Sequence, residues 1–545
     1  MLGIHKQGNI EKEENYGDLL APIIINFKPQ INYKSGNYYK GDIIDGKAHG
    51  KGIIYYKNGN IKYEGNFIND KFEGNGKINY ENGEYYVGEW KNSLRHGKGI
   101  LYYRNGNIKY EGDFYDGKFE GNGKYYYGNG CYYIGQEKNG KEHGKGILYS
   151  KNGNIIYEGD FFNGKFKGNG IFYKEDGQYY IGEFKNGLKH GKGKEYSKNQ
   201  NIKYEGDFIN GKREGNGKYY LKNGEYFVGE WKKGLRNGKG IYYNINGNII
   251  YEGDFIKDKF HGNGKYYYEN GQIYIGEWKS DLRHGKGILY SKIGNILYEG
   301  DFIKDTYEGH GKAYWENGDY YIGQWKNGFK NGKGVLYYKN GNILYDGDFY
   351  NDVYEGSGKY YWENGEYYIG QWKNGLKHGI GIYYYRIGNI KYEGNFINDK
   401  IEGNGKYYYE NGEYYVGEWQ KGLRHGKGIL YYKNGNIKYE GDFINNTQDG
   451  IGKYYWESGE YYKGTWKKGL KHGKGILYYK NGNIKYEGDF IDGKCEGNGK
   501  YYWESGDYYI GTWKNGLRHG KGIIYYKNGN IKYEGGFIDD KPEHN

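Results

Sequence analysis

Histidine recurs at a regular interval along the chain, and such a series raises the question of a metal site. If the residues between copies form four strands, consecutive copies lie roughly 19 Å apart, whereas two ligands of one metal lie within about 4 Å of each other. Asn237 and Asn331 also occupy places in the series. The pattern therefore predicts a side chain that hydrogen-bonds a turn, and no metal ligand. Nine of the thirteen histidines belong to it: His49, His96, His143, His190, His284, His378, His425, His472 and His519.

Other residue types that carry chemistry are either repeated many times or isolated. None of the many Gly-x-Gly elements is followed by the Gly-Lys-Ser/Thr ending of a phosphate-binding loop. Glu-Gly-Asp recurs along the chain, whereas catalytic carboxylates need unlike surroundings at one place. Cys131 and Cys495 have no repeated histidine partner. We therefore predict that the protein is not an enzyme and that it has no catalytic, cofactor-binding or metal-binding residues and no cofactor.

Composition excludes an ordinary series of globular domains. The 545 residues include 103 glycines and 77 tyrosines but only 3 prolines, and aromatic residues make up 20% of the chain. Aliphatic residues are too few for several closed cores, and the aromatic content is too high for disorder. The two cysteines cannot form a disulfide framework, and no apolar signal or membrane-spanning stretch is found. These features predict a soluble, cytoplasmic chain with a repetitive, elongated fold.

A repeat with two alternating lengths accounts for most of the sequence. Each copy begins with an aromatic residue two positions before a glycine, and successive copies start 24 and then 23 residues apart. Tyr415 to Lys438 is a 24-residue repeat, and Tyr392 to Tyr414 is a 23-residue repeat. Positions are counted below from the first residue of each repeat. Ten pairs of repeats and one further 24-residue copy run from Tyr39 to Lys532.

Alternation with a period of two, abundant tyrosine and Asn-Gly turn signals predict two antiparallel strands per repeat. We expect the first turn to span the sixth to eleventh positions. The first position would then pair with the sixteenth, the third with the fourteenth and the fifth with the twelfth. In the longer repeat, Asn-Gly predicts a two-residue primed second turn, and in the shorter repeat we expect a three-residue loop that ends in a left-handed glycine. The difference in length would then be absorbed by the turn type.

Glycine occupies the third and fourteenth positions of every complete repeat, so the paired strands carry an unbroken glycine row. Because glycine has no Cβ, the sheet is expected to curl into a trough along this row and to bury aromatic side chains without a second layer. At the fifth position Glu137 replaces the aromatic residue; it predicts a local break in the row or a notch for a partner, with an exposed glutamate as the plainer alternative. The structural aromatic row consists of Trp90, Phe114, Trp231, Phe255, Trp278, Phe302, Trp325, Phe349, Trp372, Phe396, Trp419, Phe443, Trp466, Phe490 and Trp513.

The segment YIGTWKNGLRHGKG, from Tyr509 to Gly522, resembles the MORN repeat, and the resemblance extends over about nine-tenths of the chain. The 23-residue repeats depart from the pattern by carrying Phe for Trp and, in most copies, Glu-Gly for His-Gly. The predicted fold class is all-β: an elongated, single-layer antiparallel β-meander or solenoid of about 22 MORN hairpins, curled into a trough along the glycine row. Long MORN-only arrays occur in protist cytoskeletal proteins and in ciliary radial-spoke heads, so the resemblance implies a cytoskeletal or axonemal role.

The sequence predicts that the chain has four parts. Residues 1–15 form an amino-terminal extension, and residues 16–38 form a degenerate capping repeat that ends in YKSGNY. Residues 39–532 hold the array of 21 repeats, and residues 533–545 form a truncated last repeat with a carboxy-terminal tail. Charged residues and a proline at the end of the array are expected to blunt the open strand.

Charge pattern narrows the choice of partners. The repeat Tyr415 to Lys438 has a net charge of +4 and the repeat Tyr392 to Tyr414 one of -3, so basic and acidic bands alternate. A nucleic acid would meet repulsion at every second band. We expect a non-enzymatic scaffold, a protein-interaction rod that binds other proteins along its repeat surface, at the cytoskeleton or cilium. Self-association of the rods, as a homodimer or a larger assembly, is a further hypothesis. The alternative function is a peripheral membrane tether that binds acidic phospholipids.

Overall fold

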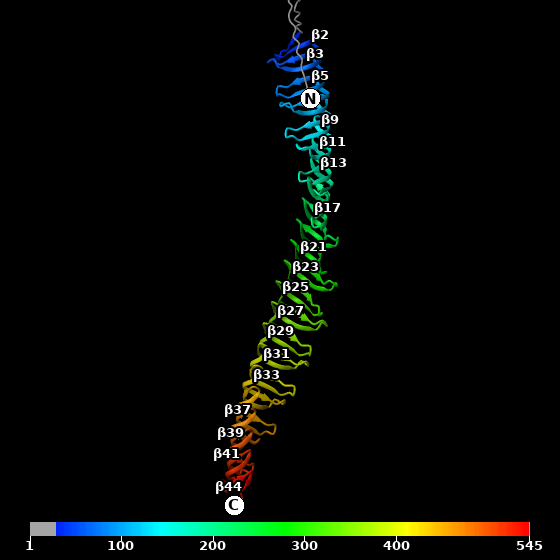
Figure 1. Cartoon of the computed structure of the whole chain (residues 1–545). Helices are drawn as coiled ribbons and strands as arrows, with labels where there is room; N and C mark the ends of the chain where they lie inside the picture. Colours follow the sequence, from blue (N-terminus) through cyan, green and yellow to red (C-terminus); the bar gives the residue numbers. More distant parts are fainter. Residues whose placement is uncertain (1–28, 544–545) are drawn as a thin grey trace, which may run out of the picture. The chain divides into compact units, whose positions relative to one another are not determined.

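The computed structural model describes residues 29–543 and is all-β. Antiparallel strands follow one another in chain order in a single layer, joined by short turns (Figure 1). The chain divides into two compact units, Met1–Asn248 and Ile249–Asn545. Within the described residues there is no helix of the length and apolarity needed to cross a membrane. The predicted extension at residues 1–15 and the first part of the predicted cap, residues 16–28, lie outside the described residues.

The strands of the first unit are paired antiparallel, each with the next in the chain. They are β1 Gln30–Asn32, β2 Tyr38–Ile44, β3 Lys47–Tyr55, β4 Ile61–Ile68, β5 Lys71–Asn79, β6 Tyr85–Lys91, β7 Leu94–Tyr102, β8 Ile108–Tyr115, β9 Lys118–Tyr126, β10 Tyr132–Lys138, β11 Lys141–Tyr149, β12 Ile155–Phe162, β13 Lys165–Tyr173, β14 Tyr179–Lys185, β15 Leu188–Tyr196, β16 Ile202–Ile209, β17 Lys212–Tyr220, β18 Tyr226–Lys232 and β19 Leu235–Tyr243.

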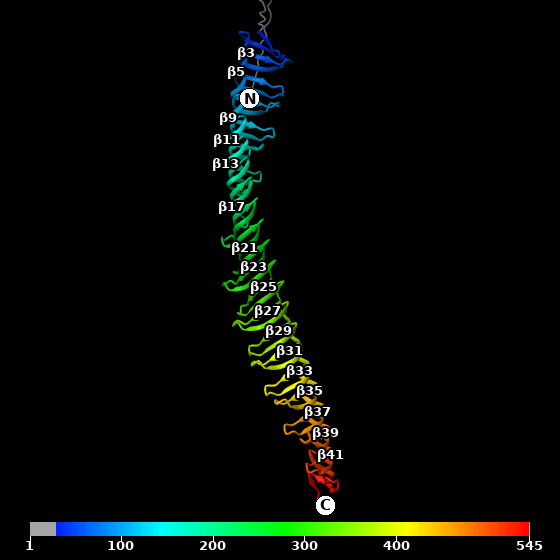
Figure 2. The same cartoon turned by 180° about the vertical axis from the view of Figure 1, so that it is seen from behind.

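The second unit has the same succession of antiparallel strands, seen from behind in Figure 2. Its strands are β20 Ile249–Ile256, β21 Lys259–Tyr267, β22 Ile273–Lys279, β23 Leu282–Tyr290, β24 Ile296–Ile303, β25 Thr306–Tyr314, β26 Tyr320–Lys326, β27 Phe329–Tyr337, β28 Ile343–Tyr350, β29 Val353–Tyr361, β30 Tyr367–Lys373, β31 Leu376–Tyr384, β32 Ile390–Ile397, β33 Lys400–Tyr408, β34 Tyr414–Gln420, β35 Leu423–Tyr431, β36 Ile437–Ile444, β37 Thr447–Tyr455, β38 Tyr461–Lys467, β39 Leu470–Tyr478, β40 Ile484–Ile491, β41 Lys494–Tyr502, β42 Tyr508–Lys514, β43 Leu517–Tyr525, β44 Ile531–Ile538 and β45 Lys541–Pro542.

Strand pairing follows the glycine row, as the repeat that begins at Tyr415 illustrates. β34 and β35 pair Tyr415 with Leu430 and Gly417 with Gly428, and β36 then pairs Tyr439 with the same Leu430. The same register recurs in repeats of both units. The predictions that the first position pairs with the sixteenth, and the third with the fourteenth, are confirmed.

The first turn of the repeat is tighter than predicted. Trp419 pairs with Arg424 at the tenth position, and the turn between them is centred on Lys421 and Gly422. The φ angles of these two residues, 49° and 83°, are those of a two-residue type I′ turn. The prediction that the fifth position pairs with the twelfth is therefore wrong. The excess residues enter a bulge in β35, where Gly426 has a φ of 66°.

The second turn has the same geometry in both kinds of repeat. In the 24-residue repeat the amide of Gly435 donates to the carbonyl of Tyr432 at 3.0 Å, and Gly435 has a φ of 84°. In the 23-residue repeat Gly412 donates to Tyr409 at 3.0 Å and has a φ of 86°. Both are three-residue loops that end in a left-handed glycine. The prediction for the shorter repeat is confirmed, and the two-residue turn predicted for the longer repeat is wrong.

A bulge in the strand, and not a change of turn, accommodates the 24th residue. Tyr431 pairs with Ile437, whereas the adjacent Leu430 pairs with Tyr439, so Lys438 has no residue opposite it. The corresponding strands of the shorter repeat, β33 and β34, pair without a shift. One extra residue in one strand of an antiparallel pair is the definition of a β-bulge.

The bulged lysine reaches a carboxylate of the preceding repeat. Lys438 Nζ lies 2.6 Å from Glu413 and 5.2 Å from the centre of the Tyr432 ring. Both charged side chains are about four-fifths buried, so solvent screens them less than a surface pair. Equivalent ion pairs join Lys109 to Glu84, Lys391 to Glu366 and Lys485 to Glu460.

Deletion of Lys438 should be tolerated, because it converts a 24-residue repeat into a 23-residue one without changing the face of any other side chain. We expect the protein to fold with a loss of about 2 kcal/mol, between the values for an exposed and a fully buried ion pair, because Glu413 loses its partner. Hydrogen exchange in β35 and β36 measures this loss. The matched control is deletion of Glu440, which pairs in regular register and whose removal turns the following side chains of β36 to the wrong face. Equal exchange in the two deletions would contradict the bulge.

Candidate functional site

Tyrosines at the first position form the floor of the concave face. Tyr415 is 0% exposed, and its hydroxyl donates to the carbonyl of Glu418 at 3.1 Å. Its ring lies across Gly417 and Gly428, where a Cβ on Gly417 would approach the Gly428 Cα to 2.5 Å. Two strands and a tyrosine ring are therefore in close contact along the glycine row, and a side chain at either glycine would prevent this contact. Burial is also the main cause that raises the pKa of these phenols.

The predicted aromatic row lies beside this floor. All fifteen of its residues face the concave side and are between 0% and 8% exposed. Trp419 illustrates the contacts: its indole N–H donates to the carbonyl of Gly405 at 3.4 Å, and its ring meets Tyr415 edge-on at 5.2 Å. Five further fifth-position residues are buried in the same way: Phe67, Phe161, Phe184, Phe208 and Phe537.

Cations at the tenth position cover the aromatic rings of the 24-residue repeats. The Arg424 guanidinium lies 5.1 Å from the centre of the Phe443 ring and 5.7 Å from that of Tyr415. Lys189 lies 4.7 Å from the Tyr180 ring in the first unit. These distances are those of cation–π contacts. Sequence reasoning missed them, because the tenth position faces the trough only when the first turn has two residues.

Glu137 occupies the fifth position of one 24-residue repeat and is 5% exposed, so the alternative of an exposed glutamate is wrong. Its cross-strand partner on β11 is Glu142, at the tenth position. Burial and then the charge of Glu142 raise the pKa of Glu137 to about 8. Glu142 accepts a hydrogen bond from the Tyr127 hydroxyl. A pair of carboxylates therefore stands where nine of the other ten 24-residue repeats place a ring and a cation.

The outer face carries the second and fifteenth positions. Val87 and Ile100 are opposite one another on β6 and β7, and Glu111 and Lys124 are opposite one another on β8 and β9. Apolar pairs thus alternate with charged pairs along the sheet. Val87 is 40% exposed, so these apolar side chains are accessible.

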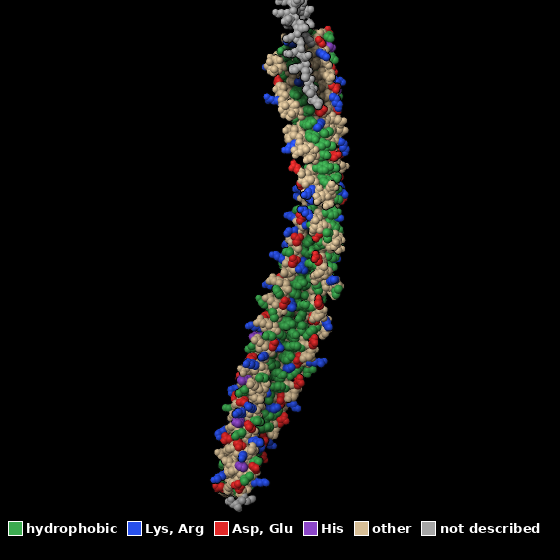
Figure 3. All heavy atoms as spheres, in the orientation of Figure 1, with side chains coloured by type: hydrophobic (Ala, Val, Ile, Leu, Met, Phe, Trp, Pro, Cys, Tyr) green, Lys and Arg blue, Asp and Glu red, His purple; other side chains and the backbone are tan. Residues whose placement is uncertain are grey.

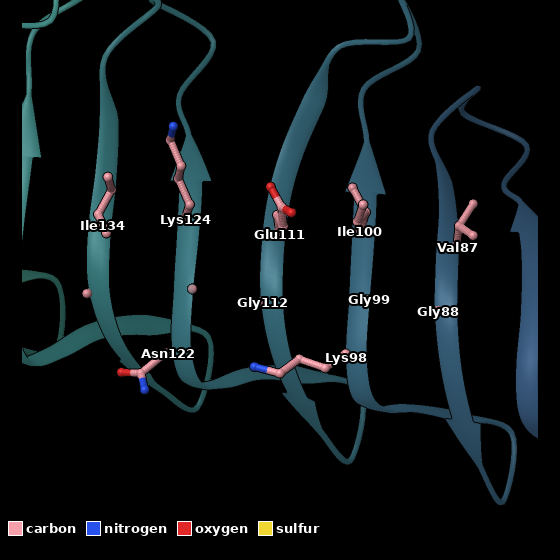
Figure 4. Close-up of a pocket in the computed structure, with 12 residues that line it drawn as sticks. Val87, Gly88, Lys98, Gly99, Ile100, Glu111, Gly112, Asn122, Lys124 and Ile134 are labelled. Atoms are coloured by element: carbon pink, nitrogen blue, oxygen red, sulfur yellow. The ribbon is translucent and has the colours of Figure 1, made fainter.

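A shallow groove follows the glycine row on this face. In the first unit it has a volume of about 660 Å³. Figure 4 shows Val87, Ile100, Glu111, Lys124 and Ile134 side by side along one margin, with Lys98 and Asn122 at the other. An equivalent groove of about 610 Å³ in the second unit is lined by Ile275, Ile288, Glu299, Lys312 and Ile322, among others.

Ion pairs join the lysine at the thirteenth position of most 24-residue repeats to an aspartate of the next repeat. Lys98 Nζ lies 2.5 Å from Asp113, and Lys286 Nζ lies 2.6 Å from Asp301. The same arrangement joins Lys145 to Asp160, Lys192 to Asp207, Lys333 to Asp348 and Lys474 to Asp489. In Figure 3 hydrophobic side chains gather in a stripe along the second unit, with charges of both signs on its margins. The alternating bands expected from the sequence thus meet in cross-strand pairs.

The histidine series lies beside the bulge and does not form the predicted turn hydrogen bonds. Nδ1 is buried without a hydrogen-bond partner in eight copies, because the tight turn leaves the eleventh position outside it. The ring of His96 instead packs 5.2 Å from Tyr115, and that of His143 lies 5.1 Å from Phe162. Between residues 29 and 543 no three histidine, cysteine or acidic side chains are grouped to hold a metal ion.

Three solved structures align with the chain at low similarity. A protein of unknown function from Bacteroides caccae is 12% identical over 47% of this chain and 91% of that chain, with a TM-score of 0.11. A mutant TCP10 domain of CPAP from Danio rerio is 12% identical over 46% and 95%, with a TM-score of 0.14. PorZ of the type IX secretion system of Porphyromonas gingivalis is 9% identical over 93% and 80%, with a TM-score of 0.13. TM-scores this low carry no argument.

No curated protein sequence matches the chain significantly. The sequence profile of the MORN repeat, in contrast, matches twenty-one consecutive segments. The first covers residues 39–61 and the last covers residues 509–531, and their starting points are those of the repeats described above. The strand pairing, the glycine row and the aromatic floor all follow the same period as these matches. The chain therefore belongs to the MORN-repeat family: it is a tandem array of MORN repeats, which take part in protein or membrane interactions.

Proposed function

We propose that this MORN array is a non-enzymatic scaffold that binds other proteins along its outer face. The observation that supports this function is the recurring groove beside the glycine row, where apolar pairs such as Ile275 with Ile288 alternate with charged pairs such as Glu299 with Lys312. An extended segment of another protein, apolar and charged in alternation, matches that lining. Cytoskeletal or axonemal proteins of the cytoplasm are the proposed partners, by analogy with long MORN-only arrays.

Charge pairing supports a protein partner over an anionic surface. Each paired lysine of the outer face, such as Lys98 with Asp113, has its charge offset within 4 Å. A nucleic acid or an acidic membrane draws its affinity from uncompensated basic residues. A second copy of the chain also presents alternating apolar and charged pairs, so self-association is part of the proposal, and light scattering of the full chain measures it.

The variant Ile275→Thr/Ile322→Thr should reduce cross-linked partner proteins at least tenfold, as measured by quantitative mass spectrometry from cells that express the chain. Both residues line the groove of the second unit, and both are about two-fifths exposed, so the change removes apolar contact without opening a core. Ile303→Thr/Ile397→Thr is the matched control, because these isoleucines are equally exposed but lie outside the groove.

The same full chain should not sediment with vesicles of phosphatidylcholine and phosphatidylserine at physiological salt. Salt-sensitive sedimentation that survives the Ile275→Thr/Ile322→Thr change would favour a membrane tether instead. Equal loss of partners in the groove variant and its control would contradict the proposed surface.

A further inference from the structure

Two 24-residue repeats of the first unit lack the cation that their sister repeats place in the trough: the repeat that begins at Tyr39 has Ala48 at the tenth position, and the repeat that begins at Tyr133 has a glutamate there. The fifth and tenth positions of the latter repeat hold Glu137 and Glu142, which are opposite one another on β10 and β11. Nine of the eleven 24-residue repeats instead hold an aromatic residue and a basic residue at these positions. The nine pairs are Trp90 with Arg95, Phe184 with Lys189, Trp231 with Arg236, Trp278 with Arg283, Trp325 with Lys330, Trp372 with Lys377, Trp419 with Arg424, Trp466 with Lys471 and Trp513 with Arg518.

The rings that a cation covers elsewhere are present at this repeat. Tyr133 and Phe161 meet edge-on at 4.9 Å, as Tyr86 and Phe114 do one pair of repeats earlier. Arg95 lies 5.8 Å from the Tyr86 ring and 5.2 Å from the Phe114 ring. Over Tyr133 and Phe161, no lysine or arginine of the described residues takes the equivalent place. The described residues therefore place two carboxylates, but no cation, beside these buried rings.

Glu137 is itself incompletely satisfied. It is 5% exposed, and the charge that acts on it is that of Glu142, which repels its own, with no cation of the described part of the chain beside it. Glu195, another carboxylate of the trough, shows the usual solution: it lies 2.6 Å from Lys189 and 2.7 Å from Arg213. Burial raises the pKa of Glu195, but these two cations hold it below its ordinary value. A buried carboxylate without a partner of this kind is costly.

We propose that the trough at Glu137 and Glu142 receives a lysine or arginine side chain of a partner protein, which takes the place that nine sister repeats fill with their own cation. The two carboxylates supply opposite charge, and the rings of Tyr133 and Phe161, which are 0% and 5% exposed, become available for a cation–π contact when the Glu142 side chain moves aside. One oxygen of Glu142 already accepts a hydrogen bond from the Tyr127 hydroxyl. The inference rests on the proposed function only in taking the partner to be a protein.

The chemistry favours a basic side chain over a metal ion. Two carboxylates are too few to hold a divalent cation, and no third histidine, cysteine or acidic ligand joins them within residues 29–543. Aromatic rings stabilise an ammonium or guanidinium group, and both occur in the equivalent place of sister repeats, as Lys189 and Arg95 show.

Binding of a fluorescent tetra-arginine peptide to the full chain tests the proposal, with the uncharged tetracitrulline peptide as the ligand control. We expect Glu137→Trp/Glu142→Arg to weaken binding at least tenfold. This variant restores the pair that sister repeats carry, so it should fold. Glu81→Gln/Glu175→Gln removes two exposed carboxylates from the second turns of other repeats of the same unit, outside the groove, and should change the affinity less than twofold. Unchanged affinity in the first variant, or equal loss in both, would overturn the site.

The pH dependence of the same binding gives a second readout. Glu137 has a pKa of about 8 in the free protein, so raising the pH from 6 to 9 ionises it while the arginines stay charged. Affinity should therefore rise severalfold over this range in the native chain, and Glu137→Gln should remove most of the rise. The groups that face Glu137 are Glu142, Tyr110, Tyr125, Tyr127 and Tyr133. A flat profile in the native chain would contradict the role of Glu137, and it would leave the outer groove of the proposed function unaffected.

Discussion

Replacing Gly112 with alanine is expected to destabilise its repeat by about 3 kcal/mol, the upper part of the range for overpacking a close contact. Gly112 on β8 pairs with Gly123 on β9. A Cβ on Gly112 would lie 2.5 Å from the Gly123 Cα and 2.6 Å from both the Asn122 carbonyl oxygen and the Tyr110 hydroxyl. Two of these neighbours are backbone atoms, so a rotamer change cannot relieve the clash.

Hydrogen exchange of the full chain measures this effect, because stability in a repeat array is a sum of local terms. Amides of β8 and β9 should exchange about a hundredfold faster in Gly112→Ala, since each 1.4 kcal/mol changes an equilibrium by about tenfold. Gly128→Ala is the matched control in the same repeat, where a Cβ meets no atom within 4 Å. Unchanged exchange in Gly112→Ala, or an equal increase in Gly128→Ala, would show that the glycine row is not needed for close packing.

The period of the sequence predicted the strand pairing because glycines at the third and fourteenth positions can meet in one way only. Gly417 and Gly428 lie opposite one another, and Tyr415 and Leu430 then follow by alternation. The turns were harder to predict because the same residues suit two solutions. Asn-Gly fits either a two-residue primed turn or the end of a three-residue loop. The choice depends on the bulge at Lys438, which no local signal in the sequence marks.

Only some of the residues on the concave face could be predicted from the sequence, because their assignment depends on the strand register and on the turns. Alternation from the glycine row places the fifth position inside, so Trp419 could be assigned to the trough from the sequence. The tenth position follows the tight turn, and its direction is decided by where the bulge lies; Arg424 was therefore missed. A signal did exist: basic residues at this position recur in nine of the eleven longer repeats, whereas aromatic residues prevail in the shorter ones. The pairing of Glu137 with Glu142 became visible only through that register.

Tyr298→Ala should destabilise its repeat by about 4 kcal/mol, the central value for removing a large buried aromatic side chain. Tyr298 is 0% exposed. Its ring stacks on Tyr307 at 3.8 Å and meets Phe302 and Trp325 edge-on at 5.1 Å and 5.6 Å. The hydroxyl donates to the Asp301 carbonyl at 3.0 Å. Tyr298→Phe should cost only about 1 kcal/mol, because it removes one hydrogen bond and keeps the ring.

Another repeat of the chain supports the expectation that Tyr298→Phe loses much less stability than Tyr298→Ala. Phe227 occupies the same position of another repeat and is also 0% exposed, so the floor accommodates a ring that has no hydroxyl. Hydrogen exchange in β24 to β26 measures both changes, with β40 to β42 as the internal reference. Tyr350→Ala, at a residue that is 60% exposed, should leave exchange within about twofold of the native chain. If Tyr298→Phe were as damaging as Tyr298→Ala, the hydroxyl-to-carbonyl bond, and not aromatic burial, would hold the single-layer sheet together.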